Sequence, residues 1–254
     1  NLEKAMALAV VFSAKQAYTK VDPLKIQLDK GVHEIVGDDS GRMNVTCSHI
    51  TFVGKGNDQT TIQGGFCVFD QQDVKFEELA ITNPRGSGVT LLGSHVEVSR
   101  CVLRCVQEKS AGIRLFDEST VVATQCEFME NGAWGVFCCE ANTKARLNDC
   151  TMHDNGQAGL FVANYAVVDL HGTKTDIHSN GRGIFAVSRA KVNIHLPSQH
   201  NTSHDNVGED RHQQGGALYS ANGSIANMNA EGTFTHVIGE IIVDTDGDED
   251  WYIV

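Results

Sequence analysis

Apolar and polar positions alternate along this chain in short runs, and the runs recur about every 24 residues. Each repeat has a glycine followed by apolar and β-branched side chains, as at 136–138 and 160–162. The glycine column consists of Gly88, Gly112, Gly135, Gly159 and Gly183. Alternation predicts strands, and a fixed period of about 20 to 50 residues is typical of a solenoid, whose units bury their apolar faces only by stacking.

Two further columns advance in step with the glycines. One consists of Cys101, Cys126, Cys150 and Thr175, each followed two residues later by an apolar side chain. The other, at the turn that follows, consists of Asn131, Asn155, Asn180 and Asn206. Residues two apart face the same side of a strand, so we expect the cysteine column in the interior. Equivalent residues of successive repeats should then be neighbours, one rung apart.

The composition favours strands over helices. The chain has 25 glycines, and no long segment with helical periodicity follows its first twenty residues. Asn-Gly pairs mark turns, because both residues accept left-handed backbone angles at low cost. We therefore predict an all-β fold, a right-handed parallel β-helix of eight or nine coils. It forms a single domain over residues 1–254, with the coils at 24–233.

The two ends of the chain carry different patterns. Residues 1–20 are dense in apolar side chains, which predicts an N-terminal helix that caps the open end of the β-helix. Residues 234–254 form a C-terminal segment with an acidic tail at 244–250. Alternating aspartates can hold Ca²⁺, but this run lacks the order of an EF-hand loop. We expect a hydrated tail and no cofactor, with calcium as the alternative.

The early coils read LKIQLDKGVHEI at 24–35, ITFVGKG at 50–56 and TTIQGG at 60–65, and they resemble the opening coils of the pectate-lyase-like β-helix superfamily. The later coils, from residue 87 to about residue 229, are similar to the parallel β-helix repeats of the carbohydrate-binding and sugar-hydrolase domain type. The resemblance implies a right-handed parallel β-helix. It leaves the activity open, since this fold hosts lyases, hydrolases, epimerases and interaction modules.

Catalysis can be judged from the motifs that this resemblance brings with it. Of the Asn-Thr-Asp, Asp-Asp, Gly-His-Gly and Arg-Ile-Lys blocks of galacturonan hydrolases, only Asp38-Asp39 occurs, and the Asp-Pro-His-Asp signature of alginate epimerases is absent. The catalytic candidates are Arg114, Asp117 and Glu140. Carboxylates on adjacent coils could work as a pair, although a solvated surface explains them equally well. We favour a non-catalytic recognition scaffold, with a polysaccharide lyase, glycoside hydrolase or epimerase as the alternative.

The outward face of the strand after each glycine is the main candidate binding surface. If Val136 and Cys138 point inward, alternation sends Phe137 outward, whereas the opposite phase would bury Arg114. We call Phe137, Phe161 and Phe185 the phenylalanine stripe. The residues assigned to the binding surface are Arg114, Phe116, Phe137, Phe161, Phe185 and Leu218.

An exposed apolar stripe of this length needs an occupant. The first alternative is the chain's own C-terminal segment at 234–243. The second is a partner protein or a second copy of the chain, which would make a homo-oligomer. The third is a glycan, for which Trp or Tyr would be a more natural platform than Phe.

Histidines form a second external row, because His153, His178 and His204 each precede a turn asparagine by two positions. Metal ligands converge on one point whereas a ladder runs along an axis, so we expect neutral stacked imidazoles and no metal. The insertion at 197–214 is a second candidate for recognition, because loops on a rigid scaffold commonly bind partners. Its candidate residues are His204, Asp205, Arg211 and His212.

Cysteine spacing bears on the cellular compartment of the protein, and net charge bears on the class of its binding partner. The 8 cysteines include no Cys-x-x-Cys pair, so we expect free thiols and a cytoplasmic or nuclear protein. Secretion is the alternative, because three Asn-x-Ser/Thr triplets occur. A net charge of -12 excludes a simple nucleic-acid binder. The sequence contains no run of 18 apolar residues, so we expect no membrane span. The expected partner is a protein or a glycan.

Overall fold

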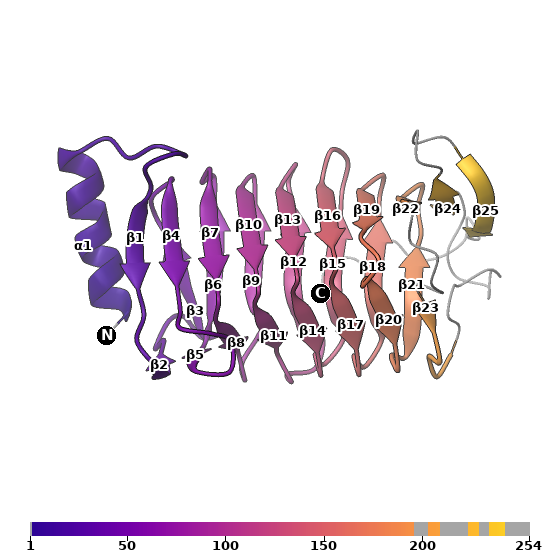
Figure 1. The fold of residues 1–254 in the computed structure, drawn as a ribbon, viewed down its shortest axis with the longest axis horizontal. Coiled ribbons are helices and arrows are strands. Elements are labelled where there is room, and N and C mark those ends of the chain that lie inside the picture. Colours follow the sequence, from indigo (N-terminus) through magenta and orange to yellow (C-terminus); the bar gives the residue numbers. More distant parts are fainter. Residues whose placement is uncertain (1, 196–202, 209–222, 229–233, 242–254) are drawn as a thin grey trace.

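Each repeat of the sequence folds into one coil of three short strands, and successive coils stack into a solenoid (Figure 1). The computed structural model describes residues 2–195, 203–208, 223–228 and 234–241, the last two stretches by their backbone alone. Every strand pair in the three sheets is parallel except β24 with β25, which is antiparallel. The predicted parallel β-helix is therefore confirmed.

The strands of the three sheets follow one another in the order that the coils impose. The ten-stranded sheet contains β1 (Leu24–Gln27), β4 (Ile50–Val53), β7 (Val74–Glu77), β10 (His95–Ser99), β13 (Thr120–Thr124), β16 (Lys144–Asn148), β19 (Val167–His171), β22 (Lys191–His195), β24 (Gly223–Met228) and β25 (Phe234–Ile241). The eight-stranded sheet contains β2 (Gly31–Glu34), β5 (Thr60–Gln63), β8 (Ala80–Thr82), β11 (Val102–Arg104), β14 (Glu127–Met129), β17 (Thr151–His153), β20 (Asp176–His178) and β23 (Ser203–His204). The seven-stranded sheet contains β3 (Arg42–Val45), β6 (Gly65–Phe69), β9 (Val89–Leu92), β12 (Ala111–Phe116), β15 (Trp134–Cys139), β18 (Ala158–Ala163) and β21 (Arg182–Ala186).

The number of complete coils is smaller than the sequence suggests. Within the described residues the seven-stranded sheet has seven rungs, so seven coils carry all three strands, not eight or nine. The insertion at 197–214 also differs from a simple projecting loop. Its residues 203–204 form β23, which pairs with β20 and continues the eight-stranded sheet.

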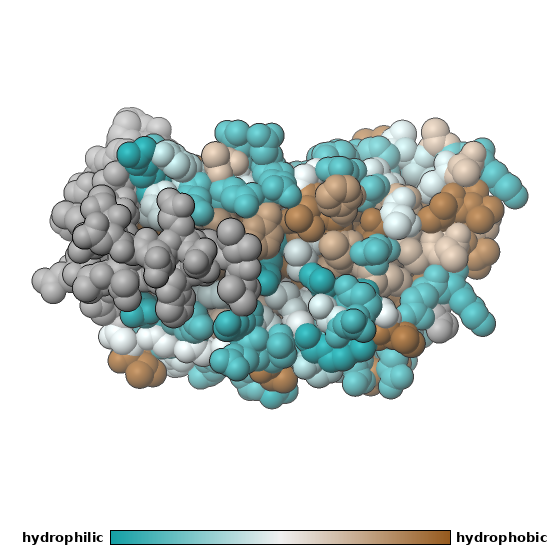
Figure 2. Space-filling model, turned by 180° about the vertical axis from the view of Figure 1, so that it is seen from behind, coloured by the Kyte–Doolittle hydropathy of each residue, from teal (hydrophilic) through white to brown (hydrophobic). Residues whose placement is uncertain are grey.

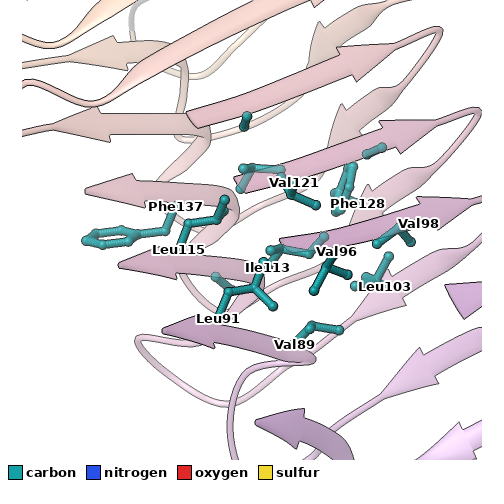
Figure 3. Close-up of a cluster of buried hydrophobic side chains, with 14 of the residues drawn as sticks. Val89, Leu91, Val96, Val98, Leu103, Ile113, Leu115, Val121, Phe128 and Phe137 are labelled. Atoms are coloured by element: carbon teal, nitrogen blue, oxygen red, sulfur yellow. The ribbon is translucent and has the colours of Figure 1, made fainter. Parts of the chain in front are cut away.

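The core fills the space between the sheets with one column of side chains per strand position. Ile113, Val136, Leu160 and Ile184 face each other in register and are fully buried. Figure 3 shows Ile113 and Leu115 pointing into this interior, whereas Phe137 points away from the other labelled side chains. The inward and outward phase predicted from alternation is therefore correct.

Asparagine side chains link the coils at the turn between the eight-stranded and seven-stranded sheets. Asn131 Nδ2 donates to Asn155 Oδ1 at 2.8 Å, Asn155 Nδ2 donates to Asn180 Oδ1 at 2.8 Å, and Asn180 Nδ2 donates to Asn206 Oδ1 at 2.9 Å. The residue before each asparagine, for example Asp154 with φ of 54°, has the left-handed conformation that turns the chain. We call these four residues the asparagine ladder.

All eight cysteines are unpaired, as their spacing predicts. Cys101, Cys126 and Cys150 line the interior and are buried. Burial raises the pKa of Cys105 to about 12. A buried thiol that stays protonated is inert, so Cys105 acts as a small apolar side chain.

Helix α1 (Leu2–Lys15) covers the first coil, which confirms the predicted N-terminal cap. Leu2, Met6 and Ala9 are buried against the core. Glu3 Oε1 accepts hydrogen bonds from the backbone N–H groups of Val36, at 2.7 Å, and Gly37, at 3.2 Å. In the rear view, hydrophobic surface gathers at the α1 end and again in the middle of the molecule (Figure 2). Within the described residues, no helix has the length and apolar content needed to cross a membrane.

Within the C-terminal segment, residues 234–241 extend the ten-stranded sheet at the other end of the solenoid. Strand β25 pairs antiparallel with β24, in the ten-stranded sheet. The sequence suggested that residues 234–243 lie along the phenylalanine stripe, but the backbone of 234–241 pairs in a different sheet from the stripe. The acidic run at 244–250, with its calcium alternative, lies outside the described residues.

Candidate functional site

The outer face of the seven-stranded sheet carries one continuous row of side chains, one per coil. From the N-terminal to the C-terminal coil, the row consists of Asn44, Cys67, Thr90, Arg114, Phe137, Phe161 and Phe185. The row is polar at its first three positions and aromatic at its last three. Arg114 lies at the junction, so a charged group and an apolar surface meet there.

The phenylalanine stripe stacks as predicted but is not exposed as predicted. Phe137 and Phe161 are stacked with ring centroids 5.0 Å apart, and Phe161 meets Phe185 edge-on at 5.2 Å. Their relative exposures are 3%, 7% and 8%. The rings cover one another, and neighbouring side chains cover their edges. The expectation of a solvent-exposed phenylalanine stripe is therefore wrong, and the stripe is a buried part of the apolar cluster on the outer side of this sheet.

Trp134 provides aromatic surface that the sequence analysis overlooked. Its ring lies 4.8 Å from that of Phe137 and 5.7 Å from that of Phe161, and it is partly exposed. Phe116, also partly exposed, contacts Phe137 at 5.5 Å. The sequence did contain a signal for Trp134, because this large aromatic residue directly precedes a glycine of the repeat, where the aligned residues are Ala111 and Ala158. No column of similar residues marked the position as outward.

Arg114 projects into this aromatic group. Its guanidinium carbon lies 5.2 Å from the centre of the Phe137 ring, 5.5 Å from that of Trp134 and 5.8 Å from that of Phe116. Burial, and then the charge of Arg42, lower the pKa of Arg114. Within the described residues the guanidinium forms no hydrogen bond or ion pair, and its buried Nε is unsatisfied. An unsatisfied buried donor is costly, so Arg114 lacks a partner that most buried polar groups in proteins have.

The charges on this sheet are all of one sign. Its seven strands contain Arg42, Arg114 and Arg182 and no Asp, Glu, Lys or His. Arg42 is paired with Asp38 at 3.3 Å, and Arg182 lies over the Phe185 ring at 5.1 Å. In a chain with a net charge of -12, a face with only cationic side chains is an electrostatic exception.

The two acidic catalytic candidates lie outside these strands, in the turns that follow β12 and β15. Glu140 Oε2 accepts a hydrogen bond from the backbone N–H of Asp117 at 2.8 Å, so it caps the neighbouring turn. Both residues have positive φ, 51° for Asp117 and 83° for Glu140. The structure therefore brings these two residues together as a turn contact rather than as a pair of carboxylates flanking a substrate.

The histidine row forms as predicted on the outside of the eight-stranded sheet. His153 stacks on His178 with centroids 5.2 Å apart, and His178 stacks on His204 at 5.6 Å. The ends of the row are not simple neutral stacks, because His153 contacts Glu127 and Asp154, at 2.8 and 2.6 Å. Burial lowers the pKa of His153, but these hydrogen bonds outweigh it and raise the pKa overall.

The insertion candidates are divided by where they lie. His204 contacts Asp205 at 2.9 Å and Asp176 at 3.0 Å, and the hydrogen bond to Asp205 is the main cause of a raised pKa for His204. These two residues therefore belong to the end of the histidine row. Arg211, His212 and Leu218 lie outside the described residues.

A second group of histidines lies on the outer face of the ten-stranded sheet, and the sequence analysis missed it. His171 and His195 stack with centroids 4.0 Å apart, and His195 Nε2 contacts Asp169 Oδ1 at 2.7 Å. Burial and then the neighbouring His195 lower the pKa of His171. The two histidines are 24 residues apart, the same spacing as the glycine column, which was the available signal.

A pocket of about 280 Å³ opens at the turns that follow β2, β5 and β8. It is lined by Glu34, Ile35, Val36, Gln63, Gly64, Pro84 and Arg85. The Arg85 guanidinium donates to the carbonyl oxygen of Val36 at 2.6 Å and so already has an acceptor. No lining residue of the pocket has a buried unsatisfied polar atom of the kind found at Arg114 Nε.

A model of the family described as "right handed beta helix region" matches residues 34–202, more than half of the chain. Among solved structures, the A-module of the mannuronan C-5 epimerase AlgE4 from Azotobacter vinelandii aligns with 84% of this chain and 71% of its own, at 13% identity and a TM-score of 0.34. No protein with a curated description matches. On the family model and the three parallel sheets, this chain belongs to the right-handed β-helix family.

Proposed function

We propose that this protein binds an acidic polysaccharide along the outer face of the seven-stranded sheet and leaves the polymer chemically unchanged. The proposal rests on the environment of Arg114. Among the residues that the structure describes, this partly buried guanidinium has no acidic partner, and it is set among aromatic rings on a face whose strands contain no carboxylate.

Charge favours a carboxylate-bearing ligand. A guanidinium presents its N–H donors in a planar fork that matches the two oxygens of a carboxylate. The aromatic surroundings of Arg114 exclude water from part of the group, which strengthens its attraction for an anion. The strands of this face carry no negative side chain, and the one carboxylate paired with a strand arginine here, Asp38, contacts Arg42 and not Arg114.

The aromatic surface favours a sugar over a simple anion. Trp134 and Phe116 are partly exposed beside Arg114 and offer flat apolar faces. Aromatic faces carry negative charge density, which suits the C–H groups on the flat side of a sugar ring. The outward row from Asn44 to Phe137 spans four rungs of about 4.8 Å, roughly 19 Å in all. An extended polymer fits such a row better than a single small molecule.

The absence of catalysis is proposed from the residues present. A hydrolase needs an acid and a base within hydrogen-bond reach of the bond it cleaves. The strands of this face provide neither, and the Glu140 carboxylate already accepts a backbone N–H. A lyase that uses Arg114 as its base is the second candidate, because the pKa of Arg114 is lowered by burial.

The proposal is tested by titration calorimetry with polygalacturonate and with the same polymer after methyl esterification of its carboxylates. We expect the protein to bind the acid form and to bind the ester at least tenfold more weakly. Raising the salt concentration should weaken binding of the acid form. The same samples are assayed for unsaturated uronates and for new reducing ends. Equal affinity for both polymers would contradict the proposal, and an unsaturated product would replace it with the lyase.

A further inference from the structure

The outer face of the ten-stranded sheet holds three metal-ligating side chains in one place. Strands β19 and β22 lie side by side (Figure 1). Asp169 and His171 are two residues apart on β19 and both point outward, as does His195 on β22. Asp169 Oδ1 and His195 Nε2 are 2.7 Å apart, and one ligand atom from each of the three residues lies within 4.8 Å of the others.

We propose that Asp169, His171 and His195 form a binding site for a divalent transition-metal ion, for which Zn²⁺ is the probe. Two imidazole nitrogens and one carboxylate oxygen suit Zn²⁺, Cu²⁺ or Ni²⁺, whereas Ca²⁺ and Mg²⁺ prefer sites built from oxygen. Three protein ligands leave a fourth tetrahedral position for water or for an external ligand.

The side chains must rearrange to bind an ion, chiefly by rotation of one imidazole ring. Tetrahedral bonds of about 2.0–2.2 Å place donor atoms roughly 3.3–3.6 Å apart. The separation of Asp169 Oδ1 and His195 Nε2 is 2.7 Å, shorter than that range, and no two ligand atoms of the set are more than 4.8 Å apart. The stacked rings are only 12° from parallel, and an ion lies in the plane of each ring that binds it, so one ring must rotate about its Cβ–Cγ bond. The side chains of Asp169 and His195 are 35% and 23% exposed, which leaves room for this rotation.

Two neighbouring side chains affect the site: one orients the Asp169 carboxylate, and the other repels the positive charge of a bound ion. Asn193 Nδ2 donates to Asp169 Oδ1 at 3.0 Å, an outer hydrogen bond of the kind that orients a ligating carboxylate. Arg146 lies opposite Asp169 on the neighbouring strand β16, and its Nε donates to Asn148 Oδ1 at 3.3 Å. A positive charge on the adjacent strand disfavours a bound cation, so replacing Arg146 by glutamine should tighten metal binding.

A bound ion would join two successive coils. Asp169 and His171 belong to one coil and His195 to the next, so the ion would act as a clip between β19 and β22. A ligand that binds only the folded state lowers the unfolding equilibrium constant, by about a hundredfold when its free concentration is 100 times its Kd. The site therefore predicts a solenoid that is stabilised by Zn²⁺.

Calorimetry of the full chain with Zn²⁺, and with Mg²⁺ as the control ion, tests this site. We expect Zn²⁺ to bind, His171→Gln and His195→Gln each to weaken it at least tenfold, and Arg146→Gln to strengthen it. His178→Gln, in the other stacked histidine row, is the matched control and should leave this binding unchanged. Absence of Zn²⁺ binding, or binding that both His171→Gln and His195→Gln leave intact, would overturn the proposal.

Two further measurements keep the result interpretable if a histidine variant unfolds. Asp169→Asn keeps the shape of the side chain while removing its charge, and it should also weaken Zn²⁺ binding at least tenfold. Co²⁺ in place of Zn²⁺ should give the visible absorption of a tetrahedral ion in the wild-type chain. A folded Asp169→Asn chain with unchanged Zn²⁺ affinity, or an octahedral Co²⁺ spectrum, would contradict the assigned ligand set.

Discussion

The guanidinium carbon of Arg114 lies 5.2 Å from the centre of the Phe137 ring, its partner in register on the next coil. This contact joins the polar and aromatic halves of the outward row on the seven-stranded sheet. A guanidinium held over a ring face is stabilised by the negative charge of that face and keeps its N–H groups free at the edge. The pair therefore holds a cation in place without neutralising it.

The first prediction concerns the phenylalanine stripe. Phe161 is packed between Phe137, Phe185 and Trp134, so Phe161→Ala should lower the free energy of unfolding by about 3 kcal/mol. Phe69 is the matched control, because it lies on the same sheet and is 58% exposed. Phe69→Ala should change stability by less than about 0.5 kcal/mol. Urea unfolding measures both, and equal effects would mean that the stripe is solvent-exposed after all.

The second prediction concerns the asparagine ladder. Asn155→Ala removes a donor to the Phe128 carbonyl and an acceptor for Asn131, which leaves buried polar groups unsatisfied. Each such group costs about 1–3 kcal/mol, so the total loss should be about 3 kcal/mol. Asn148→Ala, which breaks a partly exposed bond to Thr124, is the control and should cost about 1 kcal/mol or less. A ladder with no structural role would give similar values for the two variants.

The third prediction is a pH dependence at the histidine row. The pKa of His153 is raised in the folded protein, so its contribution to stability is fully present below the unfolded pKa of about 6.5 and is lost as pH rises through the folded pKa. The stability difference between wild type and His153→Gln should therefore shrink as pH rises from 6 to 9. Unfolding curves at several pH values measure it. A difference that grows with pH would show that the carboxylates of Glu127 and Asp154 do not stabilise the imidazolium.

The fourth prediction concerns thiol reactivity. Burial raises the pKa of Cys105 to about 12, and burial followed by the charge of Glu140 raises that of Cys139 to about 11. Because the thiolate is the reactive form, maleimide should label neither residue in the folded chain. Cys67 is only partly buried and should be labelled first. Mass spectrometry before and after unfolding provides the readout. Labelling of Cys105 as fast as Cys67 would contradict the buried position of the former.

The sequence predicts those parts of the structure that follow from its period. The spacing of the asparagines places Asn155 one rung from Asn180, and their side chains are 2.8 Å apart. Alternation likewise assigns Val136 inward and Phe137 outward. These relations need only the strand period of two and the length of a coil, both of which are local properties of the chain.

The remaining features depend on what lies above each strand. Alternation gives the direction of Phe137 but not its cover, which comes from Trp134 and the stacked rings of the adjacent coil. The Asp169 and His195 contact was missed for a related reason. The two residues are 26 positions apart in the sequence, whereas equivalent positions of successive coils are about 24 apart. Their contact therefore runs diagonally between two adjacent strands, and a search for equivalent positions does not find it.

If Arg114 binds the carboxylates of a polysaccharide, its replacement must weaken that binding, and calorimetry with polygalacturonate compares Arg114→Gln with Arg104→Gln. Arg104 is the matched control, because it is an exposed arginine on the eight-stranded sheet that pairs with Glu130. Loss of charged hydrogen bonds, at about 1.5–3 kcal/mol, predicts that Arg114→Gln raises Kd about tenfold to a hundredfold while Arg104→Gln leaves it within about twofold. Equal Kd values for the two folded variants would contradict the account.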